Sequence, residues 1–173
     1  MSTIYTVRPA TPRDAPAIAS IHVNTWKEAY EGILPEADLN GISLEKRLKQ
    51  WSEAIKFSDP QVYVAIDEDR IVGFVGFDRS RDPKSKATTG EIWAIYVGPG
   101  DWDLGAGLAL WDAARDGLVD EGCTDVTLWV MLRNERAIRF FELAGFKREL
   151  NTARTTPMGS VKVEEIRMKR KLD

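Results

Sequence analysis

A glycine-rich stretch is the part of the sequence whose residue types and spacing suggest chemistry most directly. The segment 96–107, YVGPGDWDLGAG, holds four glycines and two aspartates between an apolar strand-like run and a helical pattern. A helix N-terminus carries unpaired N–H groups and a partial positive charge, and glycine lets a phosphate approach them closely. The turn can therefore bind phosphate or pyrophosphate through its backbone. A tight strand–helix turn with close packing is the alternative that glycine spacing leaves open.

Other glycine motifs fit this sequence less well. The stretch lacks the third glycine of a dinucleotide fingerprint, and no Gly-Lys-Ser/Thr follows it as in a Walker loop. No Gly-x-Ser-x-Gly elbow occurs in the chain, which weakens an α/β-hydrolase interpretation. A nucleotide-binding domain that uses the same turn is a further alternative, and it predicts tight binding of dinucleotides.

Hydrophobic periodicity predicts the elements that position this turn. Strands are expected at 4–8, 61–66, 71–77, 90–97 and 124–131, with a last hairpin at the C-terminal end. Helices are expected from Thr11 to about Tyr30, and over 43–55, 105–121 and 134–144. The order is β-α-α-β-β-β-α-β-α-β-β, in which one strand–helix–strand unit is embedded in an otherwise antiparallel sheet. We therefore expect a mixed α+β fold with a central, mostly antiparallel sheet flanked by helices.

Composition bounds the class of protein. The chain has 173 residues, 43% apolar and 29% charged, which suits a single domain over 1–173. The net charge of −3 argues against nucleic acid as the main partner and permits a cationic substrate. No stretch is apolar enough for a membrane span, and the N-terminal segment lacks the layout of a secretory signal.

The sequence contains one cysteine, Cys123, and one histidine, His22. A single cysteine excludes an internal disulfide and fits a reducing, cytoplasmic location. A lone histidine makes no metal site by itself, so no metal is expected. We interpret His22 as a packed or surface residue and Cys123 as a structural one.

Two segments of the chain resemble two sequence patterns of the GNAT superfamily of N-acetyltransferases and occur in the same order as those patterns. The segment 91–107, EIWAIYVGPGDWDLGAG, is similar to the acyl-CoA signature of that family, a Gln/Arg-x-x-Gly-x-Gly/Ala turn after a strand. The segment 134–146, NERAIRFFELAGF, is similar to the family's Asn-x-x-Ala-x-x-Phe-Tyr-x-x-x-Gly-Phe pattern. The expected order of elements is also the GNAT order, so the resemblance covers essentially the whole chain.

The resemblance implies an acetyl-CoA site. Backbone groups at Ile95 and Val97 would pair with the pantetheine arm, and the amides of 104–107 would hold the pyrophosphate. Asn134 would contact the pantetheine arm or an ordered water. The full set of cofactor-binding residues expected in this way is Ile95, Tyr96, Val97, Trp102, Asp103, Leu104, Gly105, Ala106, Gly107, Asn134 and Phe141.

Three residues depart from the family pattern. Trp102 stands at the usual Gln/Arg position, and Asp103 stands where glycine is frequent. We expect Asp101 and Asp103 to point outward, where they can complement the helix N-terminus. Phe141 stands where many relatives have tyrosine, and phenylalanine cannot protonate a leaving thiolate. Tyr30 is a candidate substitute.

The resemblance also implies a catalytic base and an acceptor pocket. Glu91 matches the position of a glutamate that acts as base in several members, and a solvent-exposed strand-end carboxylate is the alternative. The segment 22–35 resembles the substrate-side helices of one GNAT group. Trp26 and Tyr30 share a helix face there and can wall the pocket with Trp93 and Trp129, although core packing is the alternative for each.

The expected activity is therefore direct transfer of an acetyl group from acetyl-CoA to a primary amine. A small polyamine-like or amino-acid-like acceptor is expected first, and a peptide or protein amine second. A GNAT-fold module that binds acyl-CoA without catalysis is an alternative from another class. Homodimers are common in the superfamily, which makes a homodimer the expected assembly.

Overall fold

Seven strands form one sheet in this computed structural model, which describes residues 5–102 and 104–172. They are β1 (Thr6–Pro9), β2 (Gln61–Asp67), β3 (Arg70–Arg79), β4 (Thr89–Val97), β5 (Asp125–Met131), β6 (Lys147–Met158) and β7 (Val161–Lys171). The order across the sheet is β1-β2-β3-β4-β5-β7-β6. β4 and β5 run parallel, and the other neighbouring pairs are antiparallel. The expectation of a mixed, mostly antiparallel sheet is confirmed.

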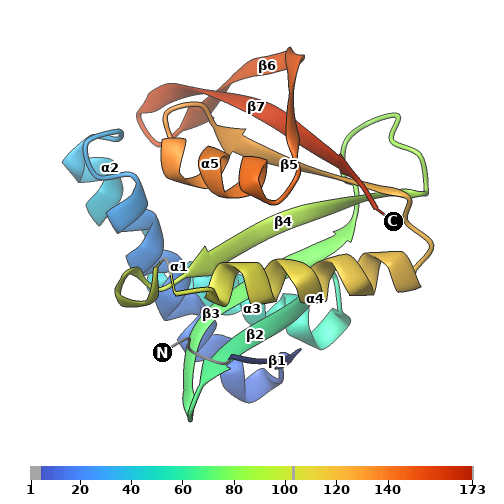
Figure 1. Cartoon of the computed structure of the whole chain (residues 1–173). Helices are drawn as coiled ribbons and strands as arrows, with labels where there is room; N and C mark the ends of the chain where they lie inside the picture. The colour runs from blue at the N-terminus through green and yellow to red at the C-terminus, as the bar shows by residue number, and fades with distance from the viewer. Residues whose placement is uncertain (1–4, 103, 173) are drawn as a thin grey trace.

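Helices cover both faces of this sheet. They are α1 (Ala15–Ala29), α2 (Glu36–Asn40), α3 (Leu44–Phe57), α4 (Ala106–Asp120) and α5 (Glu135–Leu143), with 3₁₀ turns η1 (Pro12–Asp14) and η2 (Pro99–Asp101). Figure 1 shows α4 and α5 on one face of the sheet and α1 and α3 on the other. The expected order of elements is confirmed, with α2 as an additional short helix between the first two expected helices.

Local side-chain contacts explain where the first helices begin. The Asp14 carboxylate accepts the Thr11 N–H at 2.7 Å, which is one half of a capping box. The same carboxylate pairs with Arg8 at 2.7 Å and so ties the start of α1 to β1. The Ser43 hydroxyl accepts the Lys46 N–H at 3.1 Å at the start of α3.

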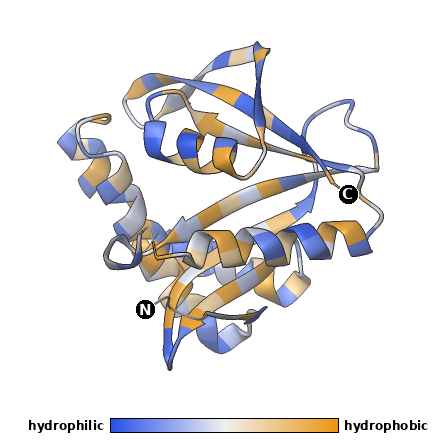
Figure 2. Cartoon of the chain, in the orientation of Figure 1, coloured by the Kyte–Doolittle hydropathy of each residue, from blue (hydrophilic) through white to orange (hydrophobic). Residues whose placement is uncertain are grey.

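The core has one part on each face of the sheet. On one face α4 and α5 pack apolar residues such as Leu110, Trp111 and Phe141 against the strands. On the other face Ile18 of α1 and Trp51 of α3 pack against β2 and β3. Figure 2 shows the matching pattern, with apolar residues along the central strands and mixed hydrophilic and apolar residues on β7.

Burial along α3 is uneven. Trp51 and Ala54 are buried, whereas Leu44 and Leu48 in the first two turns are 53% and 37% exposed. The helix meets the sheet mainly through its C-terminal half, so apolar residues in its first two turns lack a surface to cover.

A fork between β4 and β5 is the feature that positions the site. Parallel pairing joins Thr89–Glu91 of β4 to Asp125–Thr127 of β5 and extends no further. Beyond Glu91 the two strands diverge, as Figure 1 shows. β4 continues to Val97 while paired with β3 alone. One backbone edge of β4 is therefore open over its second half.

Candidate active site

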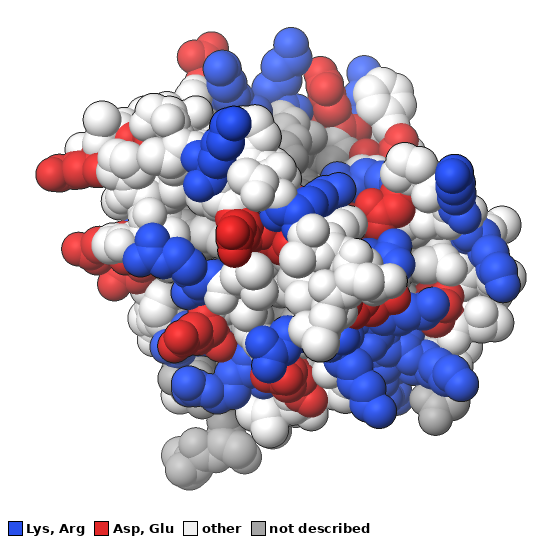
Figure 3. Space-filling view, turned by 90° about the horizontal axis from the view of Figure 1, so that it is seen from above, with Lys and Arg blue, Asp and Glu red and all other residues white. Residues whose placement is uncertain are grey.

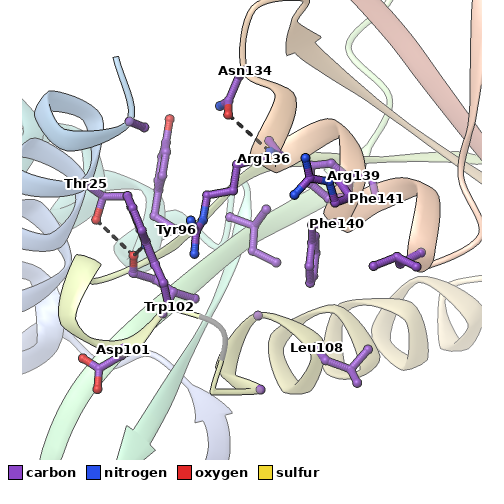
Figure 4. A pocket seen from close by; sticks show the side chains of 17 residues that line it. Thr25, Tyr96, Asp101, Trp102, Leu108, Asn134, Arg136, Arg139, Phe140 and Phe141 are labelled. Atoms are coloured by element: carbon purple, nitrogen blue, oxygen red, sulfur yellow. Dashed lines mark hydrogen bonds between the residues drawn. The ribbon is translucent and has the colours of Figure 1, made fainter. Parts of the chain in front are cut away.

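A cavity of about 430 Å³ lies at the open end of this fork. Figure 4 shows that its walls come from α1, the end of β4, the turn before α4, and α5. The lining residues are Thr25, Ala29, Ile95, Tyr96, Val97, Asp101, Trp102, Gly105, Gly107, Leu108, Asn134, Arg136, Ala137, Arg139, Phe140, Phe141 and Leu143. Most of the described residues that were expected to bind the cofactor are thereby brought together, whereas Leu104 and Ala106 are not among those that line the cavity.

The open edge of β4 presents backbone groups to the cavity. The Gly98 N–H donates to the Val72 carbonyl of β3 at 2.8 Å. Since the backbone groups of successive strand residues point to opposite sides, those of Ile95 and Val97 face away from β3. The Val97 carbonyl already accepts the Trp102 indole N–H at 2.7 Å and the Thr25 hydroxyl at 3.3 Å. A carbonyl oxygen has two lone pairs, so the Val97 oxygen can accept no further hydrogen bond. A ligand must therefore pair with other backbone groups on this edge of β4.

Two glycines of the turn have distinct structural requirements. Gly105 is the N-cap of α4 and has φ of +99°, a conformation that favours glycine. A Cβ at Gly107 would lie 3.3 Å from the Phe140 ring of α5. Gly107 therefore allows α5 to approach the first turn of α4. Asp103, which was expected in the cofactor site, lies outside the described residues.

The Asp101 carboxylate is directed away from the other lining side chains, as expected, but it is buried and not exposed to solvent (Figure 4). Asp101 is only 7% exposed. Its carboxylate accepts two hydrogen bonds from the Arg70 guanidinium, at 3.0 and 2.9 Å. The acid therefore ties the turn to the start of β3, because its charge is neutralised there by the guanidinium.

Positive charge reaches the cavity from α5. Arg136 and Arg139 both line it, opposite the glycine turn. The Arg136 guanidinium lies 4.2 Å from the centre of the Trp102 ring, a cation–π distance. Sequence reasoning missed both arginines. Their spacing of three residues placed them on one helix face, but their relation to the glycine turn depends on the packing of α5 against α4.

The phenol group of Tyr30 lies near the phenol group of Tyr96 and the side-chain amide of Asn134. The Asn134 carbonyl oxygen caps α5 by accepting the Ala137 N–H at 3.2 Å. Its side chain also hydrogen-bonds the Tyr30 hydroxyl, and burial raises the pKa of Tyr30 despite this bond. Burial likewise raises the pKa of Tyr96, which lines the cavity. Both phenols therefore stay protonated at neutral pH.

His22 supports Tyr96 from behind. The His22 ring stacks on Tyr96 with centroids 4.9 Å apart, and His22 Nδ1 accepts the Trp51 indole N–H at 2.8 Å. Burial first, and the charge of Arg47 second, lower the pKa of His22 to about 4. His22 is thus a packed residue with a neutral ring at pH 7. Cys123 is also buried, and burial raises its thiol pKa.

Phe141 and Glu91 occupy different parts of the fork. Phe141 lines the cavity and packs edge-to-face with Phe140 and Phe146. Glu91 is 1% exposed and lies where β4 and β5 part. Its carboxylate accepts the backbone N–H of Arg81 at 2.9 Å and pairs with the Arg81 guanidinium at 2.7 Å. Glu91 is not a solvent-exposed strand-end acid.

The four aromatic residues expected at the acceptor site fall into two groups, and none of them lines the cavity. Trp26 and Tyr30 meet edge-to-face, with centroids 5.0 Å apart, beside the small apolar cluster around Met131. Trp93 and Trp129 lie on β4 and β5 just beyond the fork, and each holds an arginine over its ring.

A fork in the sheet, an open strand edge and a glycine turn at a helix N-terminus define the class of an acyl-CoA-dependent acyltransferase. The match to a family model supports this, since residues 23–146 match the acetyltransferase (GNAT) family. The chain belongs to the GNAT family, and it is an acetyl-CoA-dependent acetyltransferase.

Relatives in sequence have the same general activity. The chain is 30% identical over 158 residues to the uncharacterized N-acetyltransferase YuaI of Bacillus subtilis, covering 83% of this chain and 88% of YuaI. It is 28% identical to the mycothiol acetyltransferase of Acidimicrobium ferrooxidans over 80% of this chain. The matched region is 46% of that enzyme, so the chain spans less than half of its length.

Solved structures share the fold. The structure of yncA from Salmonella typhimurium with its cofactor acetyl-CoA has a TM-score of 0.75 at 20% identity, over 99% of this chain and 95% of that one. The PaiA N-acetyltransferase of Thermoplasma acidophilum in complex with coenzyme A has a TM-score of 0.73 at 18% identity, over 97% and 99%.

The described residues contain neither a helix long and apolar enough to cross a membrane nor a cluster of three metal-ligating side chains.

Proposed function

We propose that this chain acetylates the primary amine of a small molecule, either a polyamine or an amino-acid-like compound. The observation that carries the proposal is the β4–β5 fork, which opens the Ile95 backbone onto a cavity bounded by the start of α4 and two arginines. A strand edge can pair with amides, while a helix N-terminus and guanidinium groups can hold phosphates. A pantetheine arm joined to a pyrophosphate needs both kinds of group.

The cofactor contacts are assigned on this basis. Bound in the cavity, acetyl-CoA supplies the acetyl group as a thioester. The amides of 104–107 and the side chains of Arg136 and Arg139 hold the pyrophosphate. The N–H groups of Ile95 and Val97 pair with the arm, because the Val97 carbonyl is already satisfied. Asn134 and Phe141 flank the arm from α5.

Glu91 is the proposed base. The attacking amine must lose a proton, and a carboxylate at the fork can accept it directly or through water. Glu91 Oε1 is held by the Arg81 N–H, so the orientation of the carboxylate is fixed. Trp93 and Trp129 on the strands, and Trp26 and Tyr30 at the end of α1, are the proposed contacts of the acceptor.

Tyr30 is the proposed donor to the leaving thiolate. Phe141 lacks a hydroxyl, whereas the Tyr30 hydroxyl bonds Asn134, which lines the cavity. The raised pKa keeps that hydroxyl protonated at neutral pH. Tyr96, which lines the cavity itself, is the second phenol available for this step.

Two alternatives to a small-amine acceptor are kept as proposals for comparison. The fold resembles that of a ribosomal-protein-alanine N-acetyltransferase from Brucella melitensis at 21% identity and a TM-score of 0.75, which favours a peptide as the second candidate. A module that binds acyl-CoA without catalysis is the third.

We also propose that residues 1–173 act as one domain and that the protein is cytoplasmic. We propose that it forms a homodimer, which sedimentation of the purified chain can test.

Thiol release from acetyl-CoA, followed with a panel of amines, tests the proposal. The panel contains linear diamines, amino acids and short peptides at equal concentration, with product identified by mass spectrometry. We expect acetylated small amines. Turnover with peptides alone would establish the second candidate, and CoA binding without turnover on any amine would establish the third.

A further inference from the structure

The Arg81 side chain lies in an environment suited to an organic cation. Its guanidinium carbon is 4.1 Å from the centre of the Trp93 ring, and its Nη2 is 2.7 Å from Glu91 Oε2. An aromatic face and a carboxylate together form a site that binds ammonium and guanidinium groups. The carboxylate is buried, whereas the Arg81 side chain is 53% exposed. A partly solvent-exposed cation therefore occupies a site whose carboxylate is buried.

The same arrangement occurs a second time on the neighbouring strand. The Arg154 guanidinium lies 3.5 Å from the centre of the Trp129 ring, and its Nε bonds Glu165 Oε1 at 2.7 Å. Acidic and basic side chains are interspersed over much of the face seen in Figure 3, although Lys and Arg gather at one edge. Charge of one sign therefore does not cover that face as a whole.

Both sets lie at the fork. Glu91 pairs with Thr127 at the last parallel step, and Trp93 and Trp129 follow two residues later on the two diverging strands. The loop 80–88 contacts both strands, because Arg81 binds Glu91 while the adjacent Asp82 accepts the Trp129 indole N–H at 2.9 Å. Arg81 is thus placed beside the proposed base and at the proposed site of acetyl transfer.

Rotation of one side chain can release this site. Glu91 Oε1 is bonded by the backbone N–H of Arg81, and Oε2 is bonded by its guanidinium. If the guanidinium turns into solvent, Oε2 and the face of Trp93 are exposed, while the bond to Oε1 still holds the carboxylate in place. The released guanidinium can be hydrated, because the Arg81 side chain is 53% exposed in the bound position.

We infer that Arg81 occupies the subsite of a cationic acceptor, and that the acceptor is a di- or polyamine whose reacting ammonium group displaces it from Glu91 and Trp93 and then gives its proton to Glu91. This inference rests on the proposed acetyltransferase function and specifies its substrate class. Arg81 is accordingly a specificity-determining residue, since an acceptor must compete with it. An acceptor without a positive charge gains nothing from the displacement.

The test compares wild type with Arg81→Ala, Arg81→Gln and Arg81→Lys, using 1,5-diaminopentane as the probe. Loss of the internal cation should lower KM for the diamine about fivefold in Arg81→Ala and Arg81→Gln, because a competitor for the Glu91 carboxylate and the Trp93 ring is removed. Arg81→Lys keeps a cation and should retain a KM near that of wild type. Arg148→Ala is the matched control, because Arg148 is similarly exposed and pairs with Glu142 on the surface.

Calorimetric titration of the diamine into the CoA-bound chain separates this inference from the proposed function. The dissociation constant should decrease by the same factor in Arg81→Ala, whether or not turnover is observed. A KM or dissociation constant that rises, or stays unchanged, in Arg81→Ala would overturn the inference. So would the absence of diamine binding to every variant. Diamine binding that tightens as expected, without turnover on any amine, would instead contradict the acetyltransferase activity.

Discussion

The indole N–H of Trp102 donates to the Val97 carbonyl at 2.7 Å, so the residue that departs from the family pattern closes the turn at the end of β4. The Arg136 guanidinium lies over the same ring, 4.2 Å from its centre. Trp102 therefore joins three walls of the cavity, namely β4, the glycine turn and α5. This relationship explains how the turn is held without the usual Gln or Arg side chain.

Gly107→Ala should weaken binding of CoA. The added Cβ would lie 3.3 Å from Phe140, so α5 must shift away from the first turn of α4, where the phosphates are proposed to bind. We expect the dissociation constant to rise about tenfold, the usual effect of losing a charge-assisted hydrogen bond. Calorimetric titration with CoA measures it.

Gly100→Ala is the control for that substitution. A Cβ at Gly100 meets no atom within 4 Å, and the residue precedes the proposed phosphate site in the η2 turn. CoA affinity should be unchanged in this variant. Equal weakening in both variants would indicate a general loss of turn structure and not an effect on the phosphate site.

Arg139→Ala should weaken CoA binding and make it less sensitive to salt. The guanidinium lines the cavity from α5, and its loss removes one charge-assisted contact with a phosphate. An affinity loss of roughly tenfold is expected at low ionic strength, with a smaller loss at high salt because exposed charges are screened. Titrations at two salt concentrations measure both effects. An unchanged affinity at low salt would remove Arg139 from the phosphate site.

Tyr30→Phe tests the source of the missing proton. If Tyr30 protonates the thiolate, loss of its hydroxyl should decrease kcat by about a hundredfold. The raised pKa of Tyr30 means that the donor is protonated throughout the neutral range, so the decrease should be similar at pH 7 and pH 9. Steady-state rates with a saturating amine measure it.

Phe141→Tyr is the reciprocal variant. If Tyr30 supplies the proton, a hydroxyl at position 141 should change kcat little in the wild-type background and should partly restore it in Tyr30→Phe. A large increase in kcat on Phe141→Tyr alone would show that wild type lacks an effective acid, in contradiction to the role given to Tyr30.

Stability should decrease in mild acid because of His22. Its pKa is lowered to about 4 in the native state, whereas an unfolded histidine titrates near 6.5. Between these values the unfolded state binds a proton that the native state does not. The free energy of unfolding should therefore fall as pH decreases from about 6.5 to about 4, by roughly 3 kcal/mol in all.

Urea denaturation at pH 7.5, 5.5 and 4.5 measures this dependence. His22→Gln keeps an acceptor for the Trp51 indole N–H and removes the titrating ring, so its stability should vary less over the same range. The lowered pKa of Asp14 acts mainly at lower pH, since an aspartate titrates below this window. A wild-type stability that is flat between pH 6.5 and 4.5 would contradict the buried, neutral state of His22.

Much of the fold and the location of the cofactor site could be predicted from sequence, because both depend on local patterns. Period-two strands and helical stripes set the order of elements, and the glycine turn with Asn134 marked two walls of the cavity. The missed features depend on contacts between distant segments. Arg70 and Asp101 are far apart in sequence, so the pairing that buries Asp101 had no local signal.

The same limit applies to the acceptor side. Glu91 was a clear candidate, but the guanidinium on it comes from a polar loop whose sequence does not indicate where Arg81 will lie. Residue type alone could not show whether Trp93 and Trp129 pack in the core or contact an acceptor. Their positions beyond the fork follow from the register between β4 and β5, which is a property of the folded sheet.

A thermal-shift measurement with acetyl-CoA, CoA and NAD side by side tests the central claim most directly. A ligand at a hundred times its dissociation constant stabilises the native state by ~2.7 kcal/mol, which for this size of domain raises the midpoint by roughly 5–10 °C. The account predicts such a rise with acetyl-CoA and CoA and none with NAD. No rise at saturating CoA, or an equal rise with NAD, would contradict the assignment of the fork and its glycine turn as the acetyl-CoA site.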